Sequence, residues 1–503
     1  MAVGPEQRPI RRLSELLGEW VAVRPADDRD IGGLALDSRQ VRAGDLFLAC
    51  AGGRTHGMRF ADAAIAAGAA AIAYDPAGAQ MTSGAAVPVI AVEGLGALLG
   101  DIAARFHGQP ARRMTVVGIT GTNGKTSCCH YIAQALAADG APCGVIGTLG
   151  YGLYGALRPG PHTTPDAVTL QAELARMRDA GAGRVVMEVS SHALAQGRVN
   201  AVAFAAAVFT NLSHEHLDYH GDLAGYGAAK KTLFLAPGLS FAVINRGDAF
   251  GRELITALPE SVQCIEYGLG SGNLVGRTSR YVWGDIERQS LSGIGLRVRS
   301  SWGEAVLEAP LIGRFNAENL LAVLAALLGL GMPLVEAVRR LRGLRAVPGR
   351  MERFGGGVRP LVVVDYAHTP DALEQVLRAL TDLAPRRLWC VFGCGGERDR
   401  AKRPLMGAIA ARYADHTVLT NDNPRSEDPA AIIEEIRGGM PAGAEVDVIP
   451  DRSVALRHAI AAAGGGDVVL VAGKGHEDYQ LIGEHSRPFS DRLQVQAILE
   501  EAA

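Results

Sequence analysis

The stretch Thr115-Val116-Val117-Gly118-Ile119-Thr120-Gly121-Thr122-Asn123-Gly124-Lys125-Thr126 decides the fold of the central part of this chain. It begins with β-branched residues and passes through glycines into a helical stretch. Glycines let backbone N–H groups converge on phosphate oxygens, and the N-terminus of the next helix adds positive potential. Lys125 can then reach the β- and γ-phosphate oxygens, and the Thr126 hydroxyl can bind Mg²⁺. The stretch therefore predicts a strand, a phosphate loop and a helix in that order.

The spacing of this loop departs by one residue from the usual P-loop. Ile119 stands where the first glycine is expected, and Gly118 comes one position earlier. The alternative is a glycine-rich turn that carries an exposed lysine. The order of strand, loop, Gly-Lys-Thr and helix favours a nucleotide site, and we expect its contacts to come from Gly121, Thr122, Asn123, Gly124, Lys125 and Thr126.

Around this loop the chain reads as an α/β protein of three domains. A length of 503 residues suggests roughly three domains at about 150 residues each. We predict domains at 1–109, 110–345 and 346–503, of which the second holds the phosphate loop. The N-terminal block has predicted strands at Asp45–Ala49, Ala70–Tyr74 and Val87–Val92, and a helix near Phe60–Ala67.

Alternating strands and helices follow in the other two blocks, which predicts mostly parallel, P-loop-like and Rossmann-like doubly wound sheets. Predicted strands of the central block are Cys143–Ile146, Arg184–Val189, Ala205–Phe209 and Phe241–Asn245. Those of the third block are Leu361–Asp365, Arg387–Phe392, Thr417–Thr420, Val446–Ile449 and Asp467–Val471. Ligands of such sheets lie beyond the carboxyl ends of the strands, which here means the loops Tyr366–Pro370, Gly393–Arg400, Asn421–Glu427 and Ala472–Glu477.

Composition limits the kind of protein. A net charge of -3 gives no sign of a nucleic-acid or membrane-surface protein. The seven cysteines show no CxxC pairing, and the N-terminus has no apolar signal core, so we expect reduced thiols and a cytoplasmic protein. The longest apolar run, Leu320–Val335, is broken by glycines and a proline and predicts a buried helix and turn rather than a membrane span.

Two polar segments follow predicted strands of the central block. Met187–His192 ends with a carboxylate, two hydroxyls and an imidazole, and Thr210–His220 holds a dense set of histidines and acids. The histidines suggest zinc, whereas oxygen-rich sites near phosphates more often hold Mg²⁺ with one histidine completing the shell. The structural alternative is a polar loop that caps the following helix. For His214 and His220 we expect a structural role at least as much as a functional one.

Together these segments resemble the Mur ligase family over nearly the whole chain, in order. The matching elements are LDSR…GDLF (Leu36–Phe47), TGTNGKT (Thr120–Thr126), HTTPD (His162–Asp166), MEVSSHAL (Met187–Leu194), HEHLDYHG (His214–Gly221), GRFNAEN (Gly313–Asn319), PGRMERF (Pro348–Phe354), DYAHTPDAL (Asp365–Leu373), GCGGERDRAKRP (Gly393–Pro404), DNPRSEDP (Asp422–Pro429) and GKGHEDYQ (Gly473–Gln480). The DNPR form resembles family members that add meso-2,6-diaminopimelate. The resemblance implies a monomeric ligase in peptidoglycan synthesis that uses ATP and Mg²⁺ to join this amino acid to the D-Glu carboxylate of UDP-N-acetylmuramoyl-L-Ala-D-Glu.

The same resemblance implies roles for individual residues. Lys125, Lys230, His216 and Arg350 would be catalytic, and Thr126, Glu188, His216 and Lys230 would hold the metals. Lys230 would carry a carbamate, although without the family it would read, with Lys231, as a solvated helix lysine. Asn319, Arg350 and Asp365 would contact ATP. We expect domain closure to carry Arg350 to the nucleotide, and the alternative is a domain-interface arginine.

Substrate contacts are implied in the same way. Ser38, Arg54 and Thr55 match the uridine-binding region, although Gly53-Arg54-Thr55 differs from the His/Gln-type segment of some relatives. The sugar–peptide track would be formed by Thr163, Thr164, Ser190, Gln196 and Arg198. A guanidinium pairs with the distal carboxylate of diaminopimelate and repels the bare ammonium of lysine, a task that fits Arg398 and Arg425. The rest of this pocket would comprise Asp422, Asn423, Pro424, Gly473 and Glu477.

Three alternatives stay open at this point. Arg425 can instead form a surface ion pair with Glu427. The acceptor can be L-lysine or another amine, as in a different ligase on the same scaffold such as a folylpolyglutamate or cyanophycin synthetase. The chain can also be a P-loop kinase or a regulatory nucleotide-binding protein, which needs no amine for turnover.

Overall fold

The computed structural model describes residues 9–52, 55–79, 85–270 and 280–501. The chain forms two compact units, Met1–Ile244 with Asp248–Cys264 and Asn245–Gly247 with Ile265–Ala503, which we describe separately. Within the described ranges, no helix is both long enough and apolar enough to cross a membrane.

The N-terminal part of the first unit is built on a four-stranded parallel sheet of order β3-β4-β5-β6. All five side chains of β4 and all four of β5 are buried, as expected for a parallel strand covered on both faces. The elements are β1 (Arg11–Arg12), α1 (Leu13–Leu17), β2 (Asp30–Ile31), β3 (Gly33–Ala35), η1 (Ser38–Gln40), β4 (Asp45–Ala49), η2 (Gly57–Phe60), α2 (Ala61–Ala66), β5 (Ala71–Tyr74), β6 (Val89–Ala91) and α3 (Leu95–Phe106).

The rest of the first unit carries the predicted phosphate loop. Its strands follow the order β10-β9-β8-β11-β7-β12-β13. The five from β8 to β13 in this order are parallel, while β9 and β10 add an antiparallel edge. The elements are η3 (Pro110–Arg113), β7 (Thr115–Thr120), α4 (Lys125–Ala137), β8 (Cys143–Gly147), β9 (Gly150–Leu153), β10 (Ala156–Arg158), α5 (Ala167–Asp179), β11 (Arg184–Glu188), α6 (Ser191–Ala195), β12 (Phe204–Phe209), α7 (Leu217–His220), α8 (Leu223–Lys231), η4 (Thr232–Leu235), β13 (Phe241–Asn245) and α9 (Ala249–Ala257).

The second unit begins with strands that the sequence reading did not anticipate. β15, β16 and β17 form an antiparallel meander beside β14, and the apolar helix α10 packs on β15. The buried helix and turn expected within Leu320–Val335 are present as α10 and the turn that follows it. The elements are β14 (Gln263–Leu269), β15 (Arg280–Ser290), β16 (Gly293–Ser300), β17 (Gly303–Ala309), α10 (Arg314–Gly329) and α11 (Leu334–Arg342).

The C-terminal part of the second unit is a doubly wound sheet of order β18-β19-β23-β20-β21-β22, parallel except for β18. Its elements are β18 (Glu352–Gly355), β19 (Leu361–Asp365), α12 (Pro370–Thr381), β20 (Leu388–Phe392), α13 (Lys402–Tyr413), β21 (His416–Leu419), α14 (Pro429–Arg437), β22 (Val446–Val448), α15 (Arg452–Ala462), β23 (Val468–Ala472), β24 (Tyr479–Ile482), β25 (His485–Pro488) and α16 (Asp491–Glu501).

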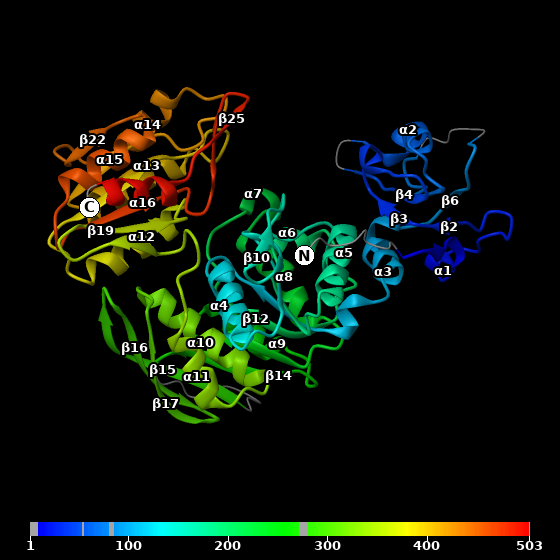
Figure 1. Cartoon of the computed structure of the whole chain (residues 1–503), viewed down its shortest axis with the longest axis horizontal. Coiled ribbons are helices and arrows are strands. Elements are labelled where there is room, and N and C mark those ends of the chain that lie inside the picture. Colours follow the sequence, from blue (N-terminus) through cyan, green and yellow to red (C-terminus); the bar gives the residue numbers. More distant parts are fainter. Residues whose placement is uncertain (1–8, 53–54, 80–84, 271–279, 502–503) are drawn as a thin grey trace. The chain divides into compact units, whose positions relative to one another are not determined.

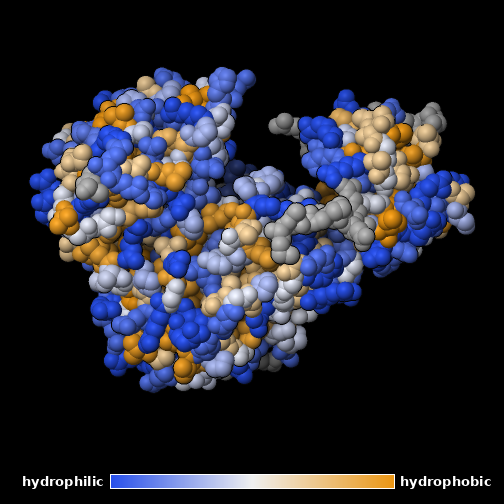
Figure 2. Space-filling model, viewed as in Figure 1, coloured by the Kyte–Doolittle hydropathy of each residue, from blue (hydrophilic) through white to orange (hydrophobic). Residues whose placement is uncertain are grey.

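Two apolar cores cover the faces of this sheet. Successive side chains of a strand point to opposite faces. Accordingly Val363 joins the core formed with α12, α13 and α14, whereas Val362 and Val364 join the core formed with α15 and α16. Figure 1 shows these helices on the two sides of the sheet, and Figure 2 shows hydrophilic side chains over much of the visible outer face. The predicted α/β class with doubly wound sheets is confirmed.

Candidate active site

The predicted phosphate loop connects β7 to α4. Gly121 and Gly124 adopt φ values of +146° and +84°, which favour glycine, and a Cβ on Gly121 would collide with the Thr210 hydroxyl. The chain after β12 braces the loop, because Asn211 accepts hydrogen bonds from the amides of Thr122 (2.8 Å) and Asn123 (2.9 Å). The first N–H groups of a helix have no partner within it, so the start of α4 can receive an anion.

Lys125 is folded back over this loop. Its Nζ donates to the carbonyl oxygens of Gly121 (2.9 Å) and Thr122 (2.7 Å). The ammonium is therefore held beside the backbone that would cradle phosphate, rather than extended into solvent. This contradicts the exposed-lysine alternative.

The oxygen atoms next to the loop fit a small hard cation. Glu188, the last residue of β11, is fully buried, and its Oε2 accepts from the Thr126 hydroxyl at 2.8 Å. Its Oε1 accepts from the Thr148 amide at 2.8 Å. Carboxylate and hydroxyl oxygens suit Mg²⁺. No three His, Cys, Asp or Glu side chains within the described ranges gather as a metal-holding group.

Lys230 lies under the loop. Its side chain is 1% exposed, its Nζ donates to Gly121 O at 2.9 Å, and it sits 4.1 Å from the centre of the Tyr226 ring. Burial lowers the pKa of Lys230 well below its usual value. The charge of Lys125 lowers this pKa further, whereas Glu215 raises it. A solvated lysine, the alternative for this position, is contradicted, and its neighbour Lys231 is the more exposed of the two.

The rings of His192, His216 and His220 lie close together in the first unit. His216 has a positive φ of +57°, and its ring lies 4.7 Å from that of His192 and 6.1 Å from that of Tyr226. No hydrogen bond in the described part of the chain joins His216 to Glu188. The side chain of His220 bonds to the Ser191 hydroxyl at 3.0 Å, whereas His214 is exposed.

The residues assigned to the sugar–peptide track form one hydrogen-bonded network beside Glu188. Thr164 donates to Glu188 O (2.9 Å) and accepts from the Ser190 amide (3.1 Å), and the Arg198 guanidinium donates to Thr164 O (2.9 Å). Arg198 also donates to Gln196 Oε1 at 2.9 Å. The network extends through Thr163, whose hydroxyl lies 3.1 Å from that of Thr148.

The N-terminal residues assigned to uridine are less connected. Ser38 begins η1. The Thr55 hydroxyl is buried and has no hydrogen-bond partner within the described ranges. Arg54 lies outside the described residues.

Two of the residues assigned to ATP in the second unit, Arg350 and Asp365, lie close together where β19 ends. Asp365 is buried and accepts from the Met351 amide at 2.8 Å. Burial raises the pKa of Asp365, against the positive charge of Arg350. The Arg350 guanidinium lies 4.4 Å from the centre of the Tyr366 ring. Asn319 lies on α10 and donates to Asn316 Oδ1 at 3.2 Å.

The loops after β20, β21 and β23 bring the predicted amino-acid pocket together. Arg425, with φ of +52°, donates through Nη1 to Gly396 O at 2.8 Å, and Asn423 Nδ2 donates to Glu477 Oε2 at 3.0 Å. A Cβ on Gly473 would lie 3.0 Å from Asp422 Oδ2. Arg398 is exposed on the first of these loops, and Pro424 lies on the second.

The predicted alternative for Arg425, an ion pair with Glu427, is wrong. Glu427 instead pairs with Arg403, which is fully buried and donates to it at 2.9 and 3.0 Å. The sequence analysis did not predict a functional role for Arg403 or Lys474, both of which are fully buried. Arg403 lies in the GCGGERDRAKRP motif and Lys474 in the GKGHEDYQ motif. Those motifs were the available signal.

Comparison with known proteins identifies the family. Three family models match, "Mur ligase family, catalytic domain" over residues 30–107, "Mur ligase middle domain" over 119–327 and "Mur ligase, glutamate ligase domain" over 349–475. A protein of Alkalilimnicola ehrlichii named UDP-N-acetylmuramoyl-L-alanyl-D-glutamate--2,6-diaminopimelate ligase is 52% identical over 98% of this chain and 99% of its own length. A protein of the same name from Pseudomonas aeruginosa is 53% identical over 94% of this chain and 96% of its own. A solved structure titled with that enzyme name is 35% identical, with a TM-score of 0.70 over 98% of this chain and 99% of that one. This chain belongs to the Mur ligase family.

Proposed function

We propose that this protein is an ATP-dependent amide ligase of peptidoglycan precursor synthesis. It would add meso-2,6-diaminopimelate to the D-Glu side-chain carboxylate of UDP-N-acetylmuramoyl-L-Ala-D-Glu. The observation that carries the choice of substrates is the full-length similarity, at 52% identity, to a relative with that enzyme name. The phosphate loop, with Lys125 at its carbonyls and Glu188 beside Thr126, supports the chemistry.

A carboxylate and an amine do not condense in water, because oxide is too poor a leaving group. In the proposed reaction a carboxylate oxygen attacks the γ-phosphorus of ATP, which gives an acyl phosphate and ADP. The free amine then attacks the acyl carbon, and inorganic phosphate leaves as the amide forms. Lys125 would screen the approach of one anion to another. Thr126, Glu188 and His216, together with a carbamate on Lys230, would hold Mg²⁺, which supplies further positive charge at the phosphates.

The buried Lys230 has the properties needed for a carbamate. Its lowered pKa favours the neutral amine, and a neutral amine adds to CO₂ to form a carbamate with loss of one proton. The product is an anion, which suits a place beside cations and phosphates better than an ammonium does. Mass spectrometry of the intact protein under bicarbonate tests this point, with a gain of one CO₂ expected for the native chain and none for Lys230→Met.

The second unit would supply the remaining contacts. Asn319 and Asp365 would contact the nucleoside of ATP, and Arg350 would neutralise the transferring phosphoryl group. Arg425 and Arg398 would pair with the distal carboxylate of diaminopimelate. Its ammonium groups would be received by Asp422, Asn423, Gly473 and Glu477, beside Pro424.

The three predicted domains at 1–109, 110–345 and 346–503 divide these tasks. The first would bind the uridine end of the substrate through Ser38, Arg54 and Thr55. The second would bind ATP and, through Thr163, Thr164, Ser190, Gln196 and Arg198, the sugar and peptide. We further propose a monomeric, cytoplasmic enzyme, a location supported by its seven free cysteines. Light scattering at assay concentration tests the oligomeric state.

Amine-dependent ADP release is the direct test of this function. ADP is measured with ATP, Mg²⁺ and UDP-N-acetylmuramoyl-L-Ala-D-Glu, adding in turn no amine, L-lysine or meso-diaminopimelate. Stoichiometric ADP and tripeptide with diaminopimelate, and little of either with lysine, is the expected result. Preference for lysine would identify the other acceptor class, and equal ADP release without amine would identify a kinase.

A further inference from the structure

Lys474 is a fully buried lysine two residues after the end of β23, in the loop that carries Glu477. Its Nζ donates to Glu477 Oε2 at 2.9 Å and to Asn423 Oδ1 at 3.2 Å, and it lies 5.4 Å from the centre of the Tyr479 ring. Burying an ammonium is costly unless it is paired and hydrogen-bonded. The hydrogen bonds to Glu477 and Asn423 therefore offset the free-energy cost of burying the Lys474 ammonium.

Asn423 is held by the same arrangement. Its Oδ1 accepts from Lys474 and from the Leu481 amide (3.0 Å), and its Nδ2 donates to Glu477 Oε2 (3.0 Å). These contacts fix the orientation of the Asn423 amide, with its oxygen toward the Lys474 ammonium and its nitrogen toward the Glu477 carboxylate. Asn423 thus connects the loop after β21 to the loop after β23.

Glu477 is left with one oxygen for a ligand. Its Oε2 receives both Lys474 and Asn423, whereas its Oε1 has no hydrogen-bond partner within the described ranges, and the side chain is 17% exposed. A carboxylate held by one oxygen presents the other in a fixed direction. Lys474 is wholly buried, so it would act through Glu477 without touching the substrate.

We infer that Lys474 is a positioning residue of the amino-acid pocket, which fixes Glu477 through Oε2 so that Oε1 accepts an ammonium of the incoming diamino acid. The inference rests on the proposed function, because it assumes that these loops bind the amine substrate. Lys474 would orient the Glu477 carboxylate in the way that supporting hydrogen bonds orient metal ligands in other proteins.

The test compares Lys474→Met with the unaltered enzyme in steady-state assays, varying one substrate at a time. We expect the KM for diaminopimelate to rise about tenfold or more, and the KM values for ATP and the UDP-linked dipeptide to stay within about twofold. In a Glu477→Gln background the same change should add little, because the residue through which Lys474 acts is already altered.

A matched control separates this role from stability alone. Arg386→Met also removes a cation that pairs with a carboxylate of the same sheet, since Arg386 donates to Asp467 at 2.8 and 2.9 Å near the amino end of β23. It should leave the KM for diaminopimelate unchanged. Should Lys474→Met not fold, Lys474→Gln, which keeps a hydrogen-bond donor, should show a smaller rise in that KM alone.

The outcomes distinguish the two claims. An unaltered enzyme that releases no ADP with any diamino acid overturns the proposed function, and this inference with it. An active unaltered enzyme whose Lys474 variants keep their KM for diaminopimelate, or lose affinity for all three substrates equally, overturns the inference alone.

Discussion

The Thr126 hydroxyl donates a hydrogen bond of 2.8 Å to Oε2 of the fully buried Glu188. This contact joins the first turn of α4 to the end of β11, the strand that pairs with β7 in parallel register. The carboxylate is thereby fixed beside the loop where the phosphates of ATP would lie. Among the residues that the structure describes, Glu188 has no basic side chain as a partner, and a buried acid of this kind beside an anion site is suited to hold a cation.

Replacing Glu188 with Gln removes that charge and keeps the shape. We expect kcat to fall about 100-fold or more, with a higher Mg²⁺ concentration needed for half-maximal rate, because screening of the phosphates is weakened. Glu173→Gln is the control, since Glu173 is also nearly buried but pairs with Arg158 and Arg176. Equal losses of kcat in both variants would contradict the metal role of Glu188.

Gly121→Ala should disrupt the phosphate loop. The new methyl would collide with the Thr210 hydroxyl, and the φ of +146° is strained for alanine. Nucleotide affinity, measured by calorimetry with a non-hydrolysable ATP analogue, should be lost. Gly140→Ala is the comparison, because Gly140 also has a positive φ (+79°) but has free space around it. It should cost about 1–2 kcal/mol of stability and retain the analogue.

Arg425→Ala should weaken use of diaminopimelate far more than binding of ATP. Loss of a guanidinium–carboxylate pair predicts a rise of about 100-fold in KM for diaminopimelate, and Arg425→Lys should rescue it only in part because lysine lacks the planar fork. Arg400→Ala, which removes an exposed arginine paired with Glu435, should have little effect. A parallel rise in the KM for ATP would argue against a pocket role for Arg425.

Acid should weaken the second unit through Glu427. The hydrogen bond from Arg403 lowers the pKa of Glu427 from 4.5 to about 2, assisted by the Glu397 amide. A carboxyl group whose pKa is lower in the folded state stabilises the fold above pH 4.5, and that contribution is lost as the pH falls from about 4.5 to about 2. Urea denaturation across this window should show a smaller loss for Glu427→Gln than for the unaltered protein. If the unfolding free energies of the two proteins fall equally with pH, the pKa of Glu427 does not contribute to acid destabilisation.

Much of the fold follows from local pattern. β4, β13 and β19 have the predicted bounds, and the runs of β13 and β19 are apolar up to a polar last residue. The other predicted strands, and the helix predicted near Phe60–Ala67, differ at their ends by one or two residues, as is usual for such boundaries. The helix predicted within Leu320–Val335 begins earlier, at Arg314. The meander β15–β17 was not predicted. Arg and Glu side chains, such as the pair Arg297 and Glu287, cover its exposed face and hide the strand signal.

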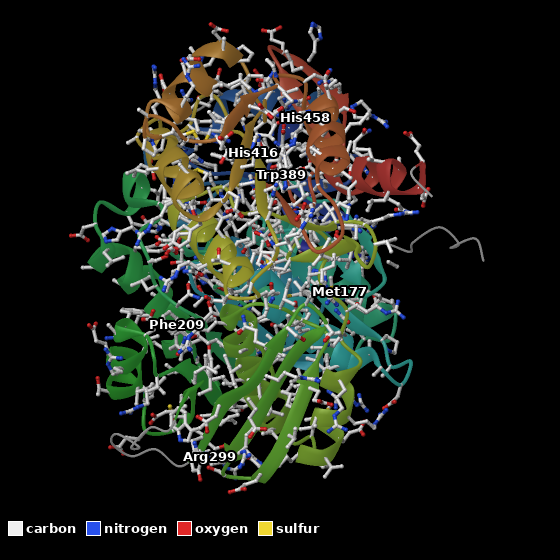
Figure 3. The ribbon with its side chains drawn as sticks, turned by 90° about the vertical axis from the view of Figure 1, so that its left-hand side faces the viewer. Met177, Phe209, Arg299, Trp389, His416 and His458 are labelled. Carbon is white, nitrogen blue, oxygen red and sulfur yellow. The ribbon has the colours of Figure 1, made fainter. Side chains whose placement is uncertain are left out.

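The sequence predicts the parts of the site that a local motif forms. It predicts less of the contacts between residues that are distant in the sequence. The order of strand, glycines, Lys125 and Thr126 identifies the loop by itself. That Lys230 rather than Lys231 is buried depends on how α8 packs. The pairing of Arg403 on α13 with Glu427 after β21, and the contact of Lys474 after β23 with Asn423 after β21, join segments that follow different strands, so no local pattern specifies them. The rings of Trp389 and His416, which are register partners on β20 and β21, have centroids 4.3 Å apart and are tilted by 39°, a contact that arises only from the tertiary fold (Figure 3).

Transfer of oxygen from the acid to phosphate tests the central claim most directly. The UDP-linked dipeptide is prepared with ¹⁸O in the D-Glu side-chain carboxylate and turned over with ATP and diaminopimelate, and the released phosphate is analysed by mass spectrometry. Activation of the acid by the end phosphate of ATP predicts one ¹⁸O in each inorganic phosphate, formed together with ADP. Phosphate without ¹⁸O, or label found in AMP, would contradict it.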